Sequence, residues 1–150
     1  MSFIVFFGNF IGTSLIISLN FFGKKKLNGF IIRVKIKITL KFLDFDNVKD
    51  KKFLIQVNTG KESSKSGVMP NEAKDFIRYC VNELKLNIIG LMCMPPIAES
   101  PKLHFALLQK IAIENNINQL SMGMSNDYVE AVMLNATYIR LGTILFGKRK

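Results

Sequence analysis

Ser121-Met-Gly-Met-Ser-Asn-Asp127 and Arg140-Leu-Gly-Thr-Ile-Leu-Phe-Gly147 are the two stretches that decide the fold of this chain of 150 residues. Each has the pattern of a strand that ends in a turn rich in Gly, Ser or Thr. Such turns direct backbone N–H groups toward one point, and a helix that begins just after Ser125 would add its positive end. Together the two turns predict a phosphate cradle.

Strands and helices are expected to alternate around these stretches, from residue 53 onward. Short apolar runs predict four strands of a buried parallel sheet, at Phe53–Val57, Asn87–Met92, Gln119–Met122 and Tyr138–Gly142. A helix is expected between each strand and the next. This alternation implies parallel pairing with right-handed crossovers.

The three expected helices each carry a signal of their own. The first begins near Pro70 and has a core-facing stripe of Ala73, Phe76, Ile77, Cys80, Val81 and Leu84. The second follows the Ser100-Pro101 start signal and runs to about Glu114. The third is short and follows Ser125. It should turn Val129, Val132 and Met133 inward, with Asn135 as a left-handed residue after its end.

Five motifs in one order give the chain a family resemblance. Leu54-Ile-Gln-Val-Asn-Thr-Gly60, Ser64-Lys-Ser-Gly67 and Gly90-Leu-Met92 precede the two stretches quoted above. In this order and spacing, the motifs resemble the C-terminal part of the YggS-like pyridoxal-phosphate homeostasis proteins, which are related to the N-terminal barrel of alanine racemase. The resemblance implies an α/β fold that is a partial (β/α)₈ TIM barrel, with parallel strands 5–8 and their helices present and the first strands missing. Phosphate sites of such barrels often follow strands seven and eight.

The resemblance also implies roles for seven residues in binding pyridoxal 5'-phosphate. They are the phosphate contacts Ser125, Gly142 and Thr143, Arg140 at the pyridine nitrogen, Lys65 near the ring hydroxyl, and Asn58 and Met92 in the pocket wall. An arginine at the pyridine nitrogen disfavours its protonation and weakens the ring as an electron sink. Taken singly, these residues could be a turn glycine, a helix cap or a strand residue on a solvated face. Their joint order favours the family roles.

The family holds its cofactor as a Schiff base on a lysine at the end of the first barrel strand, and that strand has no counterpart here. Asn9-Phe-Ile-Gly-Thr13 resembles the end of the third strand, but Ser14-Leu-Ile-Ile-Ser18 replaces the pattern expected next. The family also lacks the second domain that supplies the opposing tyrosine base of the racemases. We therefore expect a truncated member that is no enzyme, binds the cofactor weakly or has lost it, and has an N-terminal fragment as a complementing partner.

Composition changes near residue 52. Residues 1–52 carry a net charge of +7 out of the total of +10, and ten of the thirteen Phe lie within residues 1–53. The chain is therefore divided into a degenerate or atypical apolar and basic segment, residues 1–52, and the C-terminal half of a cofactor-binding barrel, residues 53–150.

An alternative function class is a small basic membrane-associated protein anchored by residues 3–23. This run has no charge and ends in Lys24-Lys25-Lys26, as a membrane span would. Two Asn lie within the run, and the start of the chain lacks the basic residues of a secretory signal. A buried apolar segment is the favoured interpretation.

The net charge invites a nucleic-acid function, but no recognised binding module accompanies it. Ile31–Leu40 alternates basic and apolar residues, as a half-buried strand does. Cys80 and Cys93 lack metal or redox spacing, which fits a cytoplasmic protein without a metal site. Cys80 is expected in the core, and His104 is expected to be a surface or packing residue.

Overall fold

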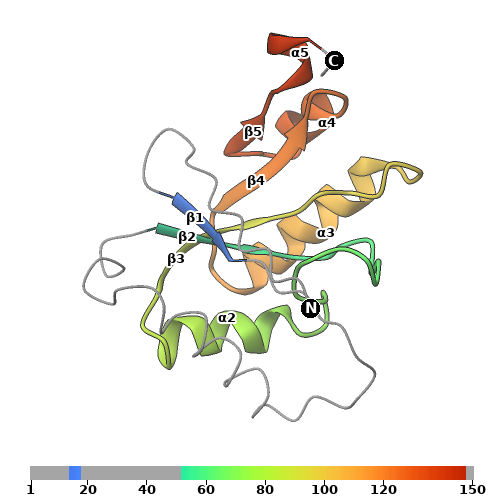
Figure 1. The fold of residues 1–150 in the computed structure, drawn as a ribbon. Helices are drawn as coiled ribbons and strands as arrows, with labels where there is room; N and C mark the ends of the chain where they lie inside the picture. Colours follow the sequence, from blue (N-terminus) through green and yellow to red (C-terminus); the bar gives the residue numbers. More distant parts are fainter. Residues whose placement is uncertain (1–13, 18–51, 148–150) are drawn as a thin grey trace.

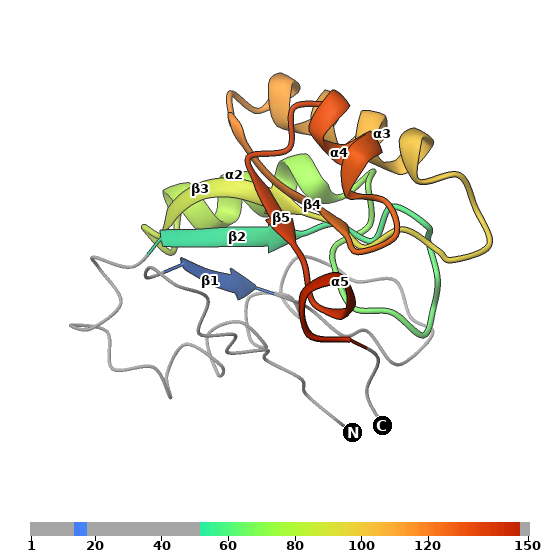
Figure 2. The ribbon, with the colours of Figure 1, turned by 90° about the horizontal axis from the view of Figure 1, so that it is seen from above.

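A parallel sheet with helices on one face is the framework of the protein (Figures 1 and 2). The computed structural model describes residues 14–17 and 52–147. In these residues, five strands pair in the order β1-β2-β3-β4-β5, which is also their order along the chain. The strands are β1 (Ser14–Ile17), β2 (Lys52–Gln56), β3 (Asn87–Met92), β4 (Gln119–Met124) and β5 (Tyr138–Arg140).

Every neighbouring pair of strands is parallel, as the sequence predicts. The helices that connect them are α2 (Ala73–Asn82), α3 (Pro101–Glu114) and α4 (Tyr128–Met133), and α5 (Thr143–Phe146) follows β5. Figure 2 shows α2, α3 and α4 together on one face of the sheet, with α5 beyond the carboxyl end of β5. The α/β fold with a parallel sheet is thus confirmed.

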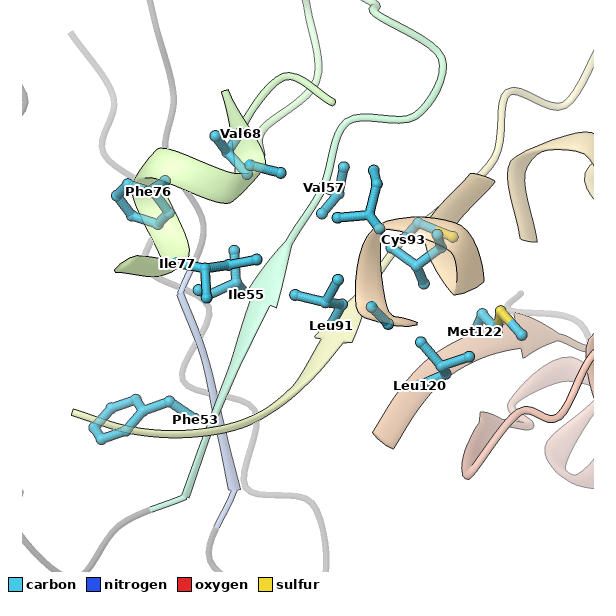
Figure 3. Close-up of a cluster of buried hydrophobic side chains, with 14 of the residues drawn as sticks. Phe53, Ile55, Val57, Val68, Phe76, Ile77, Leu91, Cys93, Leu120 and Met122 are labelled. Carbon is cyan, nitrogen blue, oxygen red and sulfur yellow. The ribbon is translucent and has the colours of Figure 1, made fainter. Parts of the chain in front are cut away.

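The hydrophobic core lies between the sheet and this helical layer (Figure 3). Side chains of a strand alternate between its two faces. The odd-numbered members of β2, β3 and β4 therefore enter the core together, among them Phe53, Ile55, Leu91, Leu120 and Met122. The even-numbered residues face the other side of the sheet, where Leu54, Gln56, Met92 and Ser121 are also buried.

The helices supply the other half of this core. Phe76, Ile77 and Cys80 of α2 and Phe105 and Leu108 of α3 are buried against the strands. The prediction that Cys80 belongs to the core is confirmed. Ser100 is the N-cap residue of α3 and Pro101 its first residue, as the sequence predicts, although the Ser100 side chain makes no capping hydrogen bond. Asn135, just after α4, has a φ of 62°, which is the expected left-handed conformation.

Two predictions of inward-facing helix residues are wrong. Val81 is 42% exposed, because it lies about 80° around the helix from Ala73, at the edge of the apolar stripe and in the last turn. Val129, Val132 and Met133 are also exposed, and α4 buries only Ala131. The reason is close packing: a Cβ added to Gly123 would lie 2.6 Å from the Ala131 Cβ. The helix meets the sheet through its one small residue, which leaves its larger apolar side chains outside.

The first strand was not predicted. Ser14–Ile17, in which the sequence shows only a lost family pattern, pairs in parallel with Lys52–Ile55 of β2. The segments Asn9–Thr13 and Ile31–Leu40, to which we gave strand-like roles, lie outside the described residues.

Candidate functional site

The predicted site residues gather at one edge of the sheet. Because β2 to β5 are parallel, their carboxyl ends meet at the same edge. Asn58 follows β2, Met92 ends β3, Ser125 follows β4 and Arg140 ends β5. Polar side chains and loop amides from four successive strands therefore share one region, which is where ligands bind in parallel α/β folds.

The turns after β4 and β5 are joined by the hydroxyl of Ser125. The backbone N–H groups of Gly142 and Ile144 both donate hydrogen bonds to the Ser125 Oγ, each at 3.3 Å. Thr143, between them, is the first residue of α5 and is exposed. Two amides that converge on one oxygen form an arrangement that can hold an anion oxygen.

The loop that carries Ser125 is itself fixed. The Asp127 Oδ1 accepts a hydrogen bond of 2.6 Å from the Met124 N–H and so closes the turn between β4 and α4. Asp127 is also the N-cap residue of α4. The Ser125 hydroxyl therefore projects from a short, hydrogen-bonded turn.

Arg140 lies across the ends of three strands. Its Nη2 donates to the Cys93 carbonyl oxygen at 2.9 Å, and its Nη1 donates to the Ser121 Oγ at 3.3 Å. Burial lowers the pKa of Arg140, while Cys93 and Asp127 raise it. Burial also raises the pKa of the Cys93 thiol to about 12. The site thus contains a half-buried guanidinium beside a neutral thiol.

Asn58 and Lys65 organise the loop after β2. The Asn58 side-chain amide donates to the Glu62 carbonyl oxygen at 2.8 Å, and its Oδ1 accepts from the Glu62 N–H at 3.2 Å. The Lys65 Nζ forms an ion pair of 2.6 Å with Glu62 and donates to the Pro95 carbonyl oxygen at 3.4 Å. Lys65 therefore links the loops after β2 and β3, while the buried Asn58 amide serves its own loop.

Three groups at the site were missed by sequence reasoning: the Ser121 hydroxyl, the Cys93 carbonyl and the Ile144 N–H. Ser121 is part of the first stretch quoted above, but no role was assigned to it. Its position two residues before Gly123, on the strand face opposite the core, is the signal that could have found it. The other two are backbone groups, which residue identity does not reveal.

His104 and the search for other centres complete the inventory. His104 is a packing residue, buried on α3, with its Nε2 3.2 Å from Glu99 Oε2. Within residues 14–17 and 52–147, no group of His, Cys, Asp and Glu side chains could hold a metal ion. None of the helices described is long and apolar enough to cross a membrane.

Comparison with known proteins places this site in a family. The family model of the alanine racemase N-terminal domain matches residues 41–150, which include β2 to α5. The chain belongs to this family. The alanine racemase N-terminal family has a TIM-barrel-like α/β fold, so the resemblance drawn from the five motifs is confirmed.

Relatives of known name agree. The chain is 38% identical over 106 residues to the pyridoxal phosphate homeostasis protein of Aquifex aeolicus, covering 65% of this chain and 46% of that protein. The human pyridoxal phosphate homeostasis protein is 32% identical over 114 residues, covering 65% of this chain and 40% of that protein. The solved structure of PipY from Synechococcus elongatus with pyridoxal phosphate bound matches with a TM-score of 0.56 and 30% identity, over 65% of this chain and 49% of PipY. The chain thus spans about half the length of these relatives.

The membrane alternative finds no support. Strand β1, which pairs with β2, lies within the run 3–23 that would form the anchor. The remainder of that run lies outside the described residues.

Proposed function

We propose that this chain is a pyridoxal 5'-phosphate-binding protein of the homeostasis type, in which residues 53–150 are the C-terminal half of a (β/α)₈ barrel. In this assignment β2 to β5 are barrel strands five to eight, the first strands are missing, and residues 1–52 are a separate, atypical segment. The family membership and the parallel order of β2 to β5 support this assignment. PipY, a relative over half its length, is solved with pyridoxal phosphate bound.

The observation that carries the proposal is the convergence of Gly142 N–H and Ile144 N–H on one oxygen, the Ser125 Oγ. A phosphate oxygen has the same acceptor character as the hydroxyl oxygen that now receives these bonds. Ser125 and the turn from Gly142 to Ile144 would therefore hold the phosphate, with Thr143 at its rim. The donors suit the ligand because all three groups can donate to an anion.

Arg140, Asn58, Met92 and Lys65 would surround the ring. The two hydrogen bonds of Arg140 use two of the five guanidinium donors, and a ring nitrogen beside the remaining positive edge stays unprotonated. Bound pyridoxal phosphate would supply an electron-withdrawing ring, which this arginine weakens. Met92 offers an apolar wall, Asn58 shapes the adjoining loop, and Lys65 is close enough to the loop after β3 to meet a ring hydroxyl.

Binding is expected to be weak and without catalysis. The lysine that forms the Schiff base in the family lies on a strand to which no part of this sequence corresponds, so the covalent contribution is lost. The two buried free cysteines fit a reducing compartment such as the cytoplasm. We expect no binding of nucleic acid.

A titration of the full chain with pyridoxal phosphate and, separately, with inorganic phosphate tests the proposal. Amide chemical shifts of Gly142, Thr143 and Ile144 should move at millimolar ligand in wild type and much less in Ser125→Ala. Arg140→Gln should weaken the cofactor more than inorganic phosphate. The matched control is Arg78→Gln, because Arg78 is exposed on α2 and paired with Asp75. Absence of any shift with either ligand would refute the proposal, and shifts with phosphate alone would leave an anion site without a cofactor role.

A further inference from the structure

Strand β5 is held at its two ends by different means. It has three residues, lies at the edge of the sheet and pairs with β4 through Ser121↔Tyr138 and Met124↔Arg140, with an irregularity between these pairs. At its amino end, the Tyr138 hydroxyl donates to Gln119 Oε1 at 2.7 Å. Just before it, the Thr137 N–H donates to the Leu120 carbonyl oxygen at 2.8 Å. Its carboxyl end, which leads into the cradle, depends on the side chain of Arg140.

The Arg140 guanidinium joins β5 to both of the preceding strands. One terminal nitrogen reaches the hydroxyl of Ser121 on β4, and the other reaches the carbonyl of Cys93, directly after β3. The Cys93 acceptor is backbone and is therefore fixed by the sheet, since the Cys93 N–H donates to the Ser121 carbonyl oxygen at 3.3 Å. Ser121 thus contributes to this junction with its side chain and its backbone, and it is 4% exposed.

We propose that Ser121 is a positioning residue: with the Cys93 carbonyl it locks the Arg140 guanidinium across β3, β4 and β5, and this lock sets the turn from Gly142 to Ile144 against Ser125. A planar guanidinium with two terminal nitrogens can satisfy both acceptors at once, whereas an ammonium group is a single point. Only two residues separate Arg140 from Thr143, so a shift of the arginine moves the amides that converge on the Ser125 hydroxyl. The inference deepens the proposed function, because the cradle is the proposed ligand site. The lock itself exists without ligand.

Hydrogen exchange of the Gly142 and Ile144 amides, measured by mass spectrometry on the full chain without ligand, tests this inference. The informative pair is Ser121→Thr and Ser121→Val, which have the same shape and differ in the hydroxyl. We expect the Thr variant to keep the wild-type exchange rate and the Val variant to exchange about tenfold faster at these amides, as loss of one hydrogen bond to a charged group implies. Because no ligand is used, the result does not depend on whether the chain binds pyridoxal phosphate.

Tyr138→Phe is the matched control. It removes a side-chain hydrogen bond between the same two strands, but at the end of β5 remote from the cradle. It should leave exchange at Gly142 and Ile144 unchanged. Equal acceleration in Tyr138→Phe and Ser121→Val would overturn the inference, since any loosening of β5 would then suffice. Equal rates in the Thr and Val variants would also overturn it.

Global unfolding is monitored by the amide of Leu108, which is buried in the core on α3. If the Val variant loses protection there as well, Arg140→Lys becomes the deciding variant, because lysine keeps the charge but cannot reach both acceptors. Faster exchange at Gly142 and Ile144 in Arg140→Lys, with Leu108 protected, supports the lock. Unchanged exchange in Arg140→Lys contradicts it.

Discussion

Replacing Gly123 by Ala should destabilise the protein more than any other single methyl group added next to the cradle. Gly123 lies near the end of β4 and has a φ of +90°, a conformation that residues with a Cβ rarely adopt. An added Cβ would lie 2.6 Å from the Ala131 Cβ and 3.1 Å from the Tyr128 Cα. Since carbon atoms pack at about 3.5–4.0 Å, α4 would have to move away from the sheet by roughly an ångström.

Two costs add in this variant. The left-handed backbone costs about 1–2 kcal/mol with a Cβ, and overpacking of a close helix–sheet contact costs about 1–3 kcal/mol. The free energy of unfolding should therefore fall by about 2–5 kcal/mol. For an m-value of about 1.5 kcal/mol per molar urea, a loss of about 3 kcal/mol lowers the urea midpoint by roughly 2 M. Far-ultraviolet circular dichroism at low protein concentration measures this midpoint.

Gly142→Ala is the control, because the two glycines differ in what surrounds them. A Cβ at Gly142 meets no atom within 4 Å, and its φ of −115° is open to any residue. The control should change the free energy of unfolding by no more than about 0.5 kcal/mol. A Gly123→Ala midpoint within error of wild type would show that α4 is not held by this contact, and the account given for its exposed valines would fail.

Three further outcomes are expected. Incubation with pyridoxal phosphate, borohydride reduction and peptide mapping should give no stoichiometric lysine adduct, and one saturable adduct would contradict the missing-lysine argument. Sedimentation of the untagged chain at moderate salt should show association, because β5 is an edge strand and Met133, Leu145 and Phe146 are exposed; a sharp monomer boundary would refute this. The thiols of Cys80 and Cys93 should resist alkylation at pH 8 until urea is added, since burial raises the pKa of each to about 12. Their folded pKa exceeds the ordinary 9.0, so the folded state binds more protons and its stability should fall as pH rises from about 9 to 12, whereas rapid alkylation of the native chain would place these thiols at the surface.

The order of strands and helices could be predicted from sequence because each apolar run has its own period and boundary signals. The strand Asn87–Met92 and the helix Pro101–Glu114 agree with their predicted bounds. Tyr138–Arg140 ends earlier than predicted, since the chain leaves the sheet at Leu141 to form the cradle turn. Local signals are strong wherever one face of an element is buried along its whole length.

Pair contacts that join distant residues could not be predicted in this way. The side on which α4 packs depends on the approach of Ala131 to Gly123, and helical periodicity alone favoured the larger valines. The partners of Arg140 lie 19 and 47 residues away, and one of them is a backbone carbonyl. The family motifs could indicate that Arg140 belongs to the site, but they could not show what holds it there.

The identity of strand order and chain order has a consequence for how such a protein can change size. Each strand described here pairs only with the strands before and after it in the sequence. A strand and its following helix are thus a self-contained step, and adding or removing one at a boundary requires no other strand to find a new neighbour. Pairing between sequence neighbours also keeps loop closure short, which favours rapid assembly. Evolution can therefore lengthen or shorten this sheet by whole steps while the geometry of the remaining strand ends stays the same.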